Sequence, residues 1–279
     1  MLGQDDILNN CLTLIEENKF PMFTILVGKK GSGKKLLANT IAPKLGKYTL
    51  HIDSRVFSVR EMINTAYQVK DSTVFIVDDA DNMSVIAKNT LLKITEEPPT
   101  NVHIIMTLVD EQNTLPTIKS RASVIKMNNY SQEDLINFYN NCSEILDKPS
   151  SNIQYIKQFC ETPGDVIQLC SFNMKEFNEY IDLVIENIAS VQLANSFKIS
   201  SKIALNDEED KYPLSLFFKA FSTKCLERFK DDPYRYGTGV KVTSKYSQEL
   251  SNISLSKQNI FDMWLLAIRN YWGAKECKE

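Results

Sequence analysis

The chain has 279 residues, of which 43% are hydrophobic and 24% charged, and its formal net charge is −3. This balance is ordinary for a globular protein, and the length allows two or three small domains. The near-neutral charge excludes a global positive field that attracts nucleic acid, so contact with DNA must be local or shared with partners. The N-terminus lacks a signal-peptide pattern, and the densest apolar run, Met263 to Ile268, is too short to span a membrane. We therefore expect a cytoplasmic protein with no membrane partner.

The first 127 residues alternate strand-like and helix-like segments. Helical composition at 34–42, which stops at Pro43, and at 84–97, which stops at Pro98-Pro99, predicts two helices. Short apolar runs predict strands at 23–27, 73–77, 102–108 and 123–127. This alternation predicts an α/β domain with a parallel sheet that is covered on both faces.

After Asn128 the pattern becomes helical. Ser131 precedes a run of acids and predicts a helix start, and the segment from there to 172 is predicted to form a small helical unit. Apolar residues at helical spacing then predict an all-α region with no clear strand over 173–279. Within it, Trp264 and Trp272 are expected in a core or a subunit interface.

The polar stretch at 230–246 mixes basic, acidic and aromatic residues. Basic residues among aromatics leave a contact with DNA open, but the mixed charge favours a solvated loop between helices.

The cysteines form no C-x-x-C pair, and neither histidine stands near them at metal-ligand spacing. We expect reduced thiols, mostly in the core, and no zinc site. The six are Cys11, Cys142, Cys160, Cys170, Cys225 and Cys277.

A phosphate-binding pattern follows the first predicted strand. Residues 28–35 read GKKGSGKK, which has the glycine, four-residue, glycine-lysine spacing of a P-loop. Backbone N–H groups of such a loop surround a phosphate, and its lysine neutralises the charge. The position between a strand and a helix favours this interpretation over a lysine-rich surface turn. The candidate nucleotide-binding residues are Gly28, Gly31, Ser32, Gly33 and Lys34.

The magnesium side of this candidate site departs from the usual pattern. A Ser or Thr hydroxyl normally binds Mg²⁺ at the last loop position, but the chain has Lys35, whose ammonium would repel a cation. Asp78 is the candidate Mg²⁺ ligand, with helix capping as the alternative role. Asp79 stands where a Glu is usual and would reach about 1 Å less far, which can cost roughly a hundredfold in rate. We therefore predict at most weak ATP or ADP binding, impaired Mg²⁺ binding, no efficient hydrolysis and no required cofactor.

A longer run of motifs extends from Val74 to Arg121. The chain reads VFIVDDADNM at 74–83, AKNTLLKITEEPP at 87–99 and LPTIKSRA at 115–122. This combination resembles subunits of bacterial DNA polymerase III clamp loaders, whose helix reads Asn-Ala-Leu-Leu-Lys-x-x-Glu-Glu-Pro-Pro before a Leu-Pro-Thr-Ile-x-Ser-Arg-Cys element. The resemblance covers residues 22–127 strongly and the remainder only by architecture. It implies an AAA+, RecA-like P-loop domain at 1–127, a helical lid at 128–172 and a helical collar for oligomerisation at 173–279.

The resemblance also implies partners. They are motor and delta-like clamp-loader subunits in a hetero-pentameric ring, a sliding clamp, and primer–template DNA reached through the complex. In that family the Ser-Arg arginine enters the ATP site of a neighbouring subunit, and a forked, permanently charged guanidinium suits this task. Arg121 is the corresponding candidate, and its alternative role is a surface or salt-bridging arginine.

The resemblance further distinguishes the subunit type. Motor subunits have a magnesium-binding hydroxyl, a polar sensor residue after the third strand and a lid arginine. Here Lys35 replaces the hydroxyl, the sensor position falls on Leu108 or Val109, and no arginine stands at or near Gly164. Together with Asp79, these losses resemble a delta-prime subunit, which has no ATPase activity in cis, retains the finger and belongs to the polymerase III holoenzyme.

One feature departs from that subunit type. The four-cysteine zinc module is absent, and residues 53–71 are short and helix-like instead, which indicates a divergent branch or a phage-type relative. An active motor ATPase with an altered loop stays open as an alternative, as does a P-loop nucleic-acid-binding protein outside replication.

Overall fold

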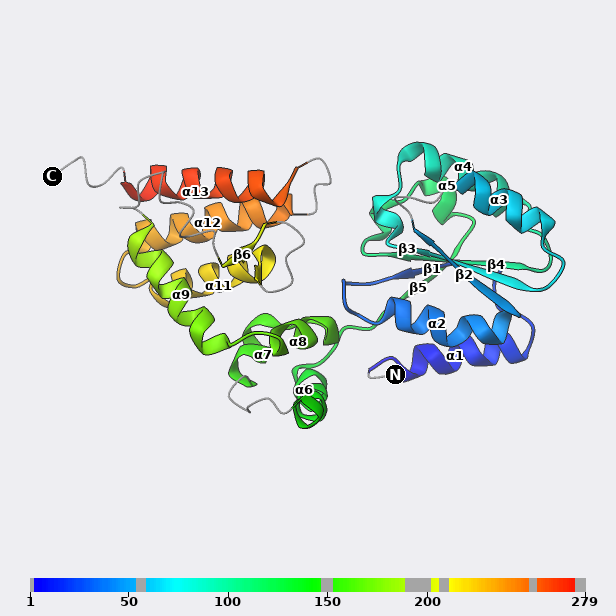
Figure 1. Ribbon diagram of the computed structural model, residues 1–279, viewed down its shortest axis with the longest axis horizontal. Coiled ribbons are helices and arrows are strands. Elements are labelled where there is room, and N and C mark those ends of the chain that lie inside the picture. The colour runs from blue at the N-terminus through cyan, green and yellow to red at the C-terminus, as the bar shows by residue number, and fades with distance from the viewer. Residues whose placement is uncertain are drawn as a thin grey trace. The chain divides into compact units, whose positions relative to one another are not determined.

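The computed structural model describes residues 3–53, 59–146, 153–188, 202–205, 211–250 and 255–273 (Figure 1). The chain divides into two compact units, Met1–Ile156 with Cys160–Gln168, and Lys157–Phe159 with Leu169–Glu279. The division passes through two short helices, α7 (Ile153–Phe159) and α8 (Pro163–Cys170). The domain bounds at 127 and 172 stay predictions.

A five-stranded parallel sheet lies at the centre of the first unit, in the order β2-β3-β4-β1-β5. Its strands are β1 (Phe23–Val27), β2 (Tyr48–Asp53), β3 (Thr73–Asp78), β4 (Val102–Leu108) and β5 (Ser123–Lys126). The three central strands are buried along almost their whole length, as expected for parallel strands that are covered on both faces. Because parallel strands end at one edge, the residues that follow β1, β3 and β4 meet there, and this edge is where ligands bind in open α/β sheets.

Helices cover both faces of this sheet (Figure 1). On one face lie α1 (Asp5–Glu16) and α2 (Lys34–Leu45), whose Leu37 and Ile41 belong to a buried cluster with Leu26 of β1. On the other face lie α3 (Val59–Gln68), α4 (Val85–Glu96) and α5 (Pro116–Lys119). Met62 of α3 and Leu91 of α4 belong to a second cluster. The predicted α/β class with a covered parallel sheet is confirmed.

Two details of the first unit differ from prediction. The edge strand β2 was not predicted, because Tyr48, Leu50 and His51 are exposed and no continuous apolar run marks it. Helix α2 continues through Pro43 to Leu45. A proline in the last turn removes only one backbone donor near a helix end, so the helix stopped later than its sequence indicated.

The connection after the sheet begins with α6 (Gln132–Leu146). Its start at Ser131 is confirmed, since the backbone N–H of Asp134 donates to Ser131 Oγ at 3.1 Å and the Asp134 carboxylate accepts from the Ser131 N–H at 3.1 Å. This reciprocal pair satisfies donors that a helix N-terminus otherwise leaves free.

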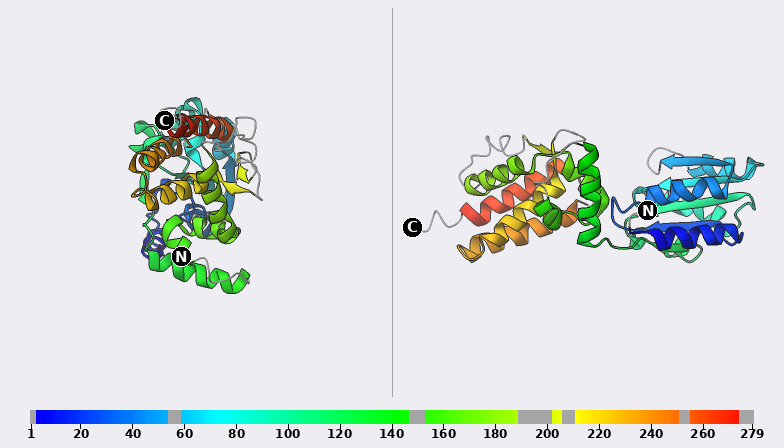
Figure 2. Two further views of the ribbon diagram at one scale, coloured as in Figure 1. Left: turned by 90° about the vertical axis from the view of Figure 1, so that its left-hand side faces the viewer. Right: turned by 90° about the horizontal axis from the view of Figure 1, so that it is seen from below.

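The second unit is built from α9 (Met174–Asn187), α11 (Leu214–Glu227), α12 (Pro233–Glu249) and α13 (Lys257–Gly273). Helix α12 packs against both α11 and α13 (Figure 2). Trp264 is fully buried among Phe217, Phe218 and Phe221, with ring centroids 5.3, 5.3 and 5.0 Å away. Its indole nitrogen donates to Thr243 Oγ1 at 2.9 Å. Trp272 is also buried, so of the two predicted places, a core or a subunit interface, both tryptophans lie in the core of this unit.

Two predictions for this unit are wrong. The stretch 230–246, predicted as a loop, is mostly helix α12, whose start is capped by Asp232 and has Pro233 at its first position. Two short parallel strands, β6 (Ile203–Ala204) and β7 (Tyr212–Pro213), also occur where no strand was expected.

The cysteines that the structure describes are free thiols. Cys11, Cys160, Cys170 and Cys225 are buried and Cys142 is partly exposed, whereas Cys277 lies outside the described residues. Nowhere in the described ranges is a helix both long and apolar enough to cross a membrane.

Candidate functional site

The loop between β1 and α2 has a backbone typical of a phosphate-binding turn. The Gly28 N–H donates to Leu108 O at 3.1 Å, which fixes the loop to the end of β4. Gly31 and Gly33 have φ angles of 79° and 89°, a left-handed conformation that glycine adopts without steric cost. Helix α2 begins directly afterwards at Lys34. The five predicted loop residues are thus brought together in one turn between a strand and a helix.

Lys34 is buried and folded back onto its own loop. Its Nζ donates to Gly28 O at 2.5 Å and to Lys29 O at 2.9 Å. Burial lowers the pKa of Lys34, and the nearby carboxylates of Asp81 and Asp79 partly oppose this shift. The ammonium therefore satisfies carbonyl groups of the loop itself, and does not extend towards a ligand.

The candidate magnesium ligand Asp78 lies at the carboxyl end of β3. Its Oδ2 is 3.3 Å from Lys35 Nζ and 3.3 Å from His51 Nδ1. Its Oδ1 is buried and has no hydrogen-bond partner among the described residues. Mg²⁺ is usually held by one or two carboxylates with waters, and the free Oδ1 could serve as one such ligand. The ammonium of Lys35 on the same carboxylate is the obstacle, because it repels a divalent cation. The residues at this position do not fit Mg²⁺.

The residues after β3 maintain the local structure of the loops around them. Asp79 has a φ of 48°, unusual for a residue with a side chain, and its N–H donates to Thr107 Oγ1 at 2.9 Å. The Asp81 carboxylate accepts from the Val109 N–H at 2.8 Å and from Asn113 Nδ2 at 2.9 Å. The sensor position therefore offers no polar side chain, since Leu108 is fully buried and Val109 is apolar and 45% exposed.

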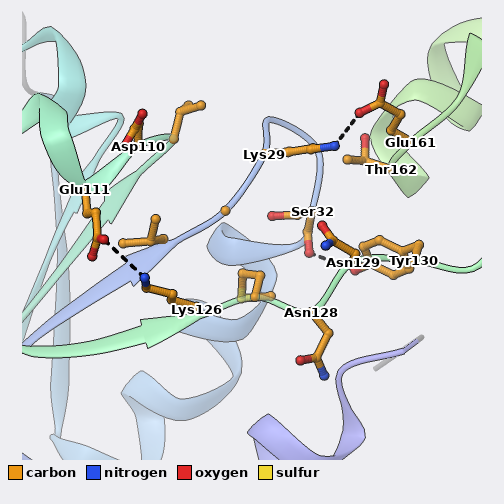
Figure 3. Close-up of a pocket in the computed structure, with 14 residues that line it drawn as sticks. Lys29, Ser32, Asp110, Glu111, Lys126, Asn128, Asn129, Tyr130, Glu161 and Thr162 are labelled. Atoms are coloured by element: carbon orange, nitrogen blue, oxygen red, sulfur yellow. Dashed lines mark hydrogen bonds and ion pairs between the residues drawn. The ribbon is translucent and has the colours of Figure 1, made fainter.

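The start of α8 and the residues just before it pack directly on the loop. The Gly164 N–H donates to Gly31 O at 3.1 Å, and Lys29 forms an ion pair with Glu161 (Figure 3). A Cβ atom on Gly164 would lie 2.5 Å from Gly31 Cα, closer than real Cβ contacts allow. This backbone contact leaves no room for a side chain at position 164, so an arginine there is incompatible with it.

A pocket with a volume of about 270 Å³ lies beside the loop, at the ends of β1, β4 and β5 (Figure 3). Pockets for small molecules usually measure roughly 300–1,000 Å³. The hydroxyl of Ser32 is buried and has no hydrogen-bond partner within the described residues. Two lysines line the pocket, but Lys29 is paired with Glu161 and Lys126 with Glu111. The pocket therefore offers little uncompensated positive charge to a polyphosphate.

Arg121 follows α5 and is held by two contacts. Its Nη2 donates to Glu96 Oε1 at 2.7 Å, and its Nη1 donates to Thr117 O at 2.7 Å. The side chain is 33% exposed. Arg121 is thus both an ion-paired surface residue and accessible to a partner.

Sequence reasoning missed several residues that form these contacts. His51 contacts Asp78 because β2 pairs in parallel with β3. Since β2 was not predicted from the sequence, this contact could not be predicted either. Glu96 is part of the Glu-Glu-Pro-Pro motif. This motif indicated a resemblance to a family, but the sequence alone predicted no role for either glutamate. Within the described residues, no three His, Cys, Asp or Glu side chains come close enough to hold a metal ion.

Comparison with protein families gives one match that crosses the candidate site. The model of a family described as DNA polymerase III, delta subunit, matches residues 49–131. This range contains β3, β4, the Glu-Glu-Pro-Pro motif and Arg121, but not the P-loop.

Curated relatives match parts of the chain. DNA polymerase III subunit gamma of Buchnera aphidicola is 31% identical over 183 residues, which are 54% of this chain and 50% of that protein. DNA polymerase III subunit delta' of Escherichia coli is 35% identical over 82 residues, which are 29% of this chain and 24% of that protein. The chain thus spans half or less of the length of these relatives.

Solved structures show the same fold at low identity. A RuvB Holliday junction branch migration motor of Thermotoga maritima has a TM-score of 0.53 at 16% identity, over 84% of this chain and 78% of that chain. A DNA polymerase III gamma subunit-related protein of the same organism has a TM-score of 0.50 at 15% identity, over 95% of this chain and 99% of that chain. The sequence matches across β3 to Arg121 thus make the chain similar to clamp-loader subunits of DNA polymerase III, and the solved structures show that it shares their fold.

Proposed function

We propose that the chain is a delta-prime-like clamp-loader subunit that does not hydrolyse ATP itself and donates Arg121 to the ATP site of a neighbouring motor subunit. The observation that carries the proposal is the Lys35–Asp78 ion pair, in which an ammonium lies 3.3 Å from the carboxylate that would otherwise hold Mg²⁺. Without a bound metal ion, the charge on a transferring phosphoryl group has no adequate counter-charge in this chain.

Three further features support the absence of hydrolysis in cis. Lys34 donates to carbonyls of its own loop, so it would have to break these bonds before it could reach a nucleotide. Gly164 packs on Gly31 where a motor subunit is expected to carry a lid arginine. The sensor position carries Leu108 and Val109, neither of which can donate a hydrogen bond from its side chain.

The role in trans rests on how Arg121 is presented. An arginine finger must be exposed, oriented and able to bind phosphate oxygens with more than one N–H group. Arg121 is partly exposed and uses two N–H groups on Thr117 O and Glu96, so that others are available to a ligand. As partners we propose motor and delta-like subunits in a five-membered ring, a sliding clamp, and primer–template DNA bound through the complex.

The test is the clamp- and DNA-stimulated ATPase of the complex reconstituted with its motor and delta-like subunits. Arg121→Ala should lower its kcat by at least about tenfold, since arginine fingers in other phosphoryl-transfer systems contribute roughly 10³–10⁵ in kcat. Arg121→Lys should also be defective, because lysine keeps the charge and loses the fork.

Lys119→Ala is the matched control, since it removes one positive charge two residues before Arg121, at the end of α5. The proposal fails if Arg121→Ala and Lys119→Ala give equal rates. A second arm measures ATP hydrolysis by the chain alone with Mg²⁺. Turnover should stay at background, and robust turnover that Lys34→Ala abolishes would reclassify the chain as a motor subunit.

A further inference from the structure

The side chain of Arg121 is fixed by a carboxylate from another helix. Glu96 is the last residue of α4, and its Oε1 accepts from Arg121 Nη2 at 2.7 Å, while Thr117 O accepts from Nη1 at the same distance. One contact comes from α4 and the other from α5, two helices that pack against each other. The guanidinium is therefore held from two directions.

The exposure of this ion pair indicates what it contributes. The Glu96 side chain is 53% exposed and that of Arg121 is 33% exposed. Ion pairs at such exposed positions add little to the stability of a fold, because solvent screens them. A carboxylate contact in addition to that with Thr117 O does restrict the rotamers of this long side chain. A guanidinium that is already oriented loses less freedom when it binds phosphate oxygens.

The Glu-Glu-Pro-Pro sequence explains why Glu96 takes this position and Glu97 does not. A residue before a proline is disfavoured in the helical conformation, so Glu97 leaves the helix, with φ −133° and ψ 71°. Glu96 thereby becomes the final residue of α4. The side chain of Glu97 makes no hydrogen bond or ion pair among the described residues.

We propose that Glu96 is the positioning residue of Arg121: it holds the guanidinium at the surface in the orientation that a neighbour's nucleotide phosphates require. The inference rests on the proposed function, since it concerns an arginine that acts in trans. The contacts to Glu96 and Thr117 use one N–H group each, on Nη2 and Nη1, and leave three of the five N–H groups of an arginine for phosphate oxygens. Glu96 acts through Arg121 and does not touch the nucleotide.

The experiment uses the reconstituted complex and compares Glu96→Gln and Glu96→Ala with Glu97→Gln and Glu97→Ala. The Glu97 variants are matched controls, because they remove the same charge one residue away. Each Glu96 variant should lower the stimulated kcat by about two- to tenfold, the scale of ordering one long side chain. KM for ATP should stay unchanged, since the motor subunit binds the nucleotide.

A double-mutant cycle separates positioning from a general structural effect. In an Arg121→Ala background, Glu96→Gln should cause no further loss. The inference is overturned if the two losses multiply, if Glu97→Gln reproduces Glu96→Gln, or if Glu96→Gln raises the rate, which would make the carboxylate a competitor of phosphate. If Arg121→Ala itself has no effect, the proposed function fails. If only Arg121→Ala has an effect, the positioning role alone fails.

Discussion

At the scale of single residues, one lysine changes the chemistry of the candidate nucleotide site. Lys35 stands where a hydroxyl would complete a magnesium site, and its ammonium instead lies 3.3 Å from Asp78. His51 contacts the same carboxylate oxygen at 3.3 Å. Asp78, the acidic residue expected beyond a P-loop, is thus retained, but the ammonium of Lys35 balances its charge. We therefore propose that this site keeps the architecture of a nucleotide site and has little affinity for a divalent cation.

Replacing this lysine by the usual hydroxyl tests that argument. Lys35→Thr should create Mg²⁺-dependent ATP binding, because it removes the repelling charge and adds a ligand. We expect at least about a tenfold gain in affinity when Mg²⁺ is added, equivalent to about 1.4 kcal/mol. A titration with a fluorescent ATP analogue, with Mg²⁺ or with a chelator, measures it.

Lys30→Thr is the control for the loss of one charge from the same loop. Lys30 is exposed and forms no hydrogen bond or ion pair among the described residues, so the wild type and Lys30→Thr should show no response to Mg²⁺. An equal response of Lys35→Thr and Lys30→Thr would refute the role of the Lys35–Asp78 pair.

At the scale of elements, the contact between the P-loop and the first turn of α8 is made by two glycines. A Cβ atom at Gly164 would lie 2.5 Å from Gly31 Cα, and one at Gly31 would lie 2.7 Å from Thr162 Oγ1. Gly31 additionally has a φ of 79°, so both steric room and backbone conformation require glycine there. Position 164, where the lid lacks an arginine, therefore packs closely against the P-loop backbone and cannot accept a larger side chain.

Gly164→Ala should destabilise the first unit, because the added methyl group must displace the backbone of the P-loop. Overpacking of this kind costs about 1–3 kcal/mol, and each kcal/mol lowers Tm by about 2–4 °C for a unit of this size. Thermal unfolding followed by far-UV circular dichroism measures the shift. Gly273→Ala is the matched control, because nothing lies within 4 Å of a Cβ atom at that position. Equal unfolding temperatures for the two variants would contradict the packing argument.

The same scale explains which elements could be predicted. The central strands β1, β3 and β4 are recognisable because burial on both faces demands unbroken apolar runs. The edge strand β2 is partly exposed and needs no unbroken apolar run, so the sequence pattern did not predict it. The mixed charge of the stretch that forms α12 favoured a loop, but the stretch packs as a helix. A Cβ atom at Gly239 would lie 2.9 Å from the Trp272 ring, so this glycine permits close packing of α12 on α13. A tertiary contact of this kind leaves no signal in local sequence.

In the candidate site, too, some features could be predicted from the sequence and others could not. The P-loop and the unfavourable effect of Lys35 on Mg²⁺ depend on residue type and short-range spacing, which the sequence contains. The contact of His51 with Asp78 depends on strand pairing, and that of Glu96 with Arg121 depends on the packing of α4 against α5. Contacts between residues 25 or 27 positions apart require the fold to be known.

At the scale of the whole molecule, the buried cores lie in separate parts of the chain. The two clusters that cover the sheet contain residues between Cys11 and Met127. The aromatic cluster around Trp264 draws on Phe217, Phe218, Phe221 and Phe261. A chain with separate cores does not have to unfold in one step.

Both tryptophans of the chain, Trp264 and Trp272, lie in the second unit, so tryptophan fluorescence reports on that unit whereas circular dichroism reports on both. Leu37→Ala removes a fully buried side chain from the first unit and should cost about 2–5 kcal/mol. It should lower the denaturation midpoint seen by circular dichroism and leave the fluorescence midpoint unchanged. Phe217→Ala, which removes an aromatic contact of Trp264, should shift the fluorescence midpoint. If Leu37→Ala moves the fluorescence midpoint together with the circular dichroism midpoint, the two units unfold as one cooperative body, and their separate cores do not confer separate stability.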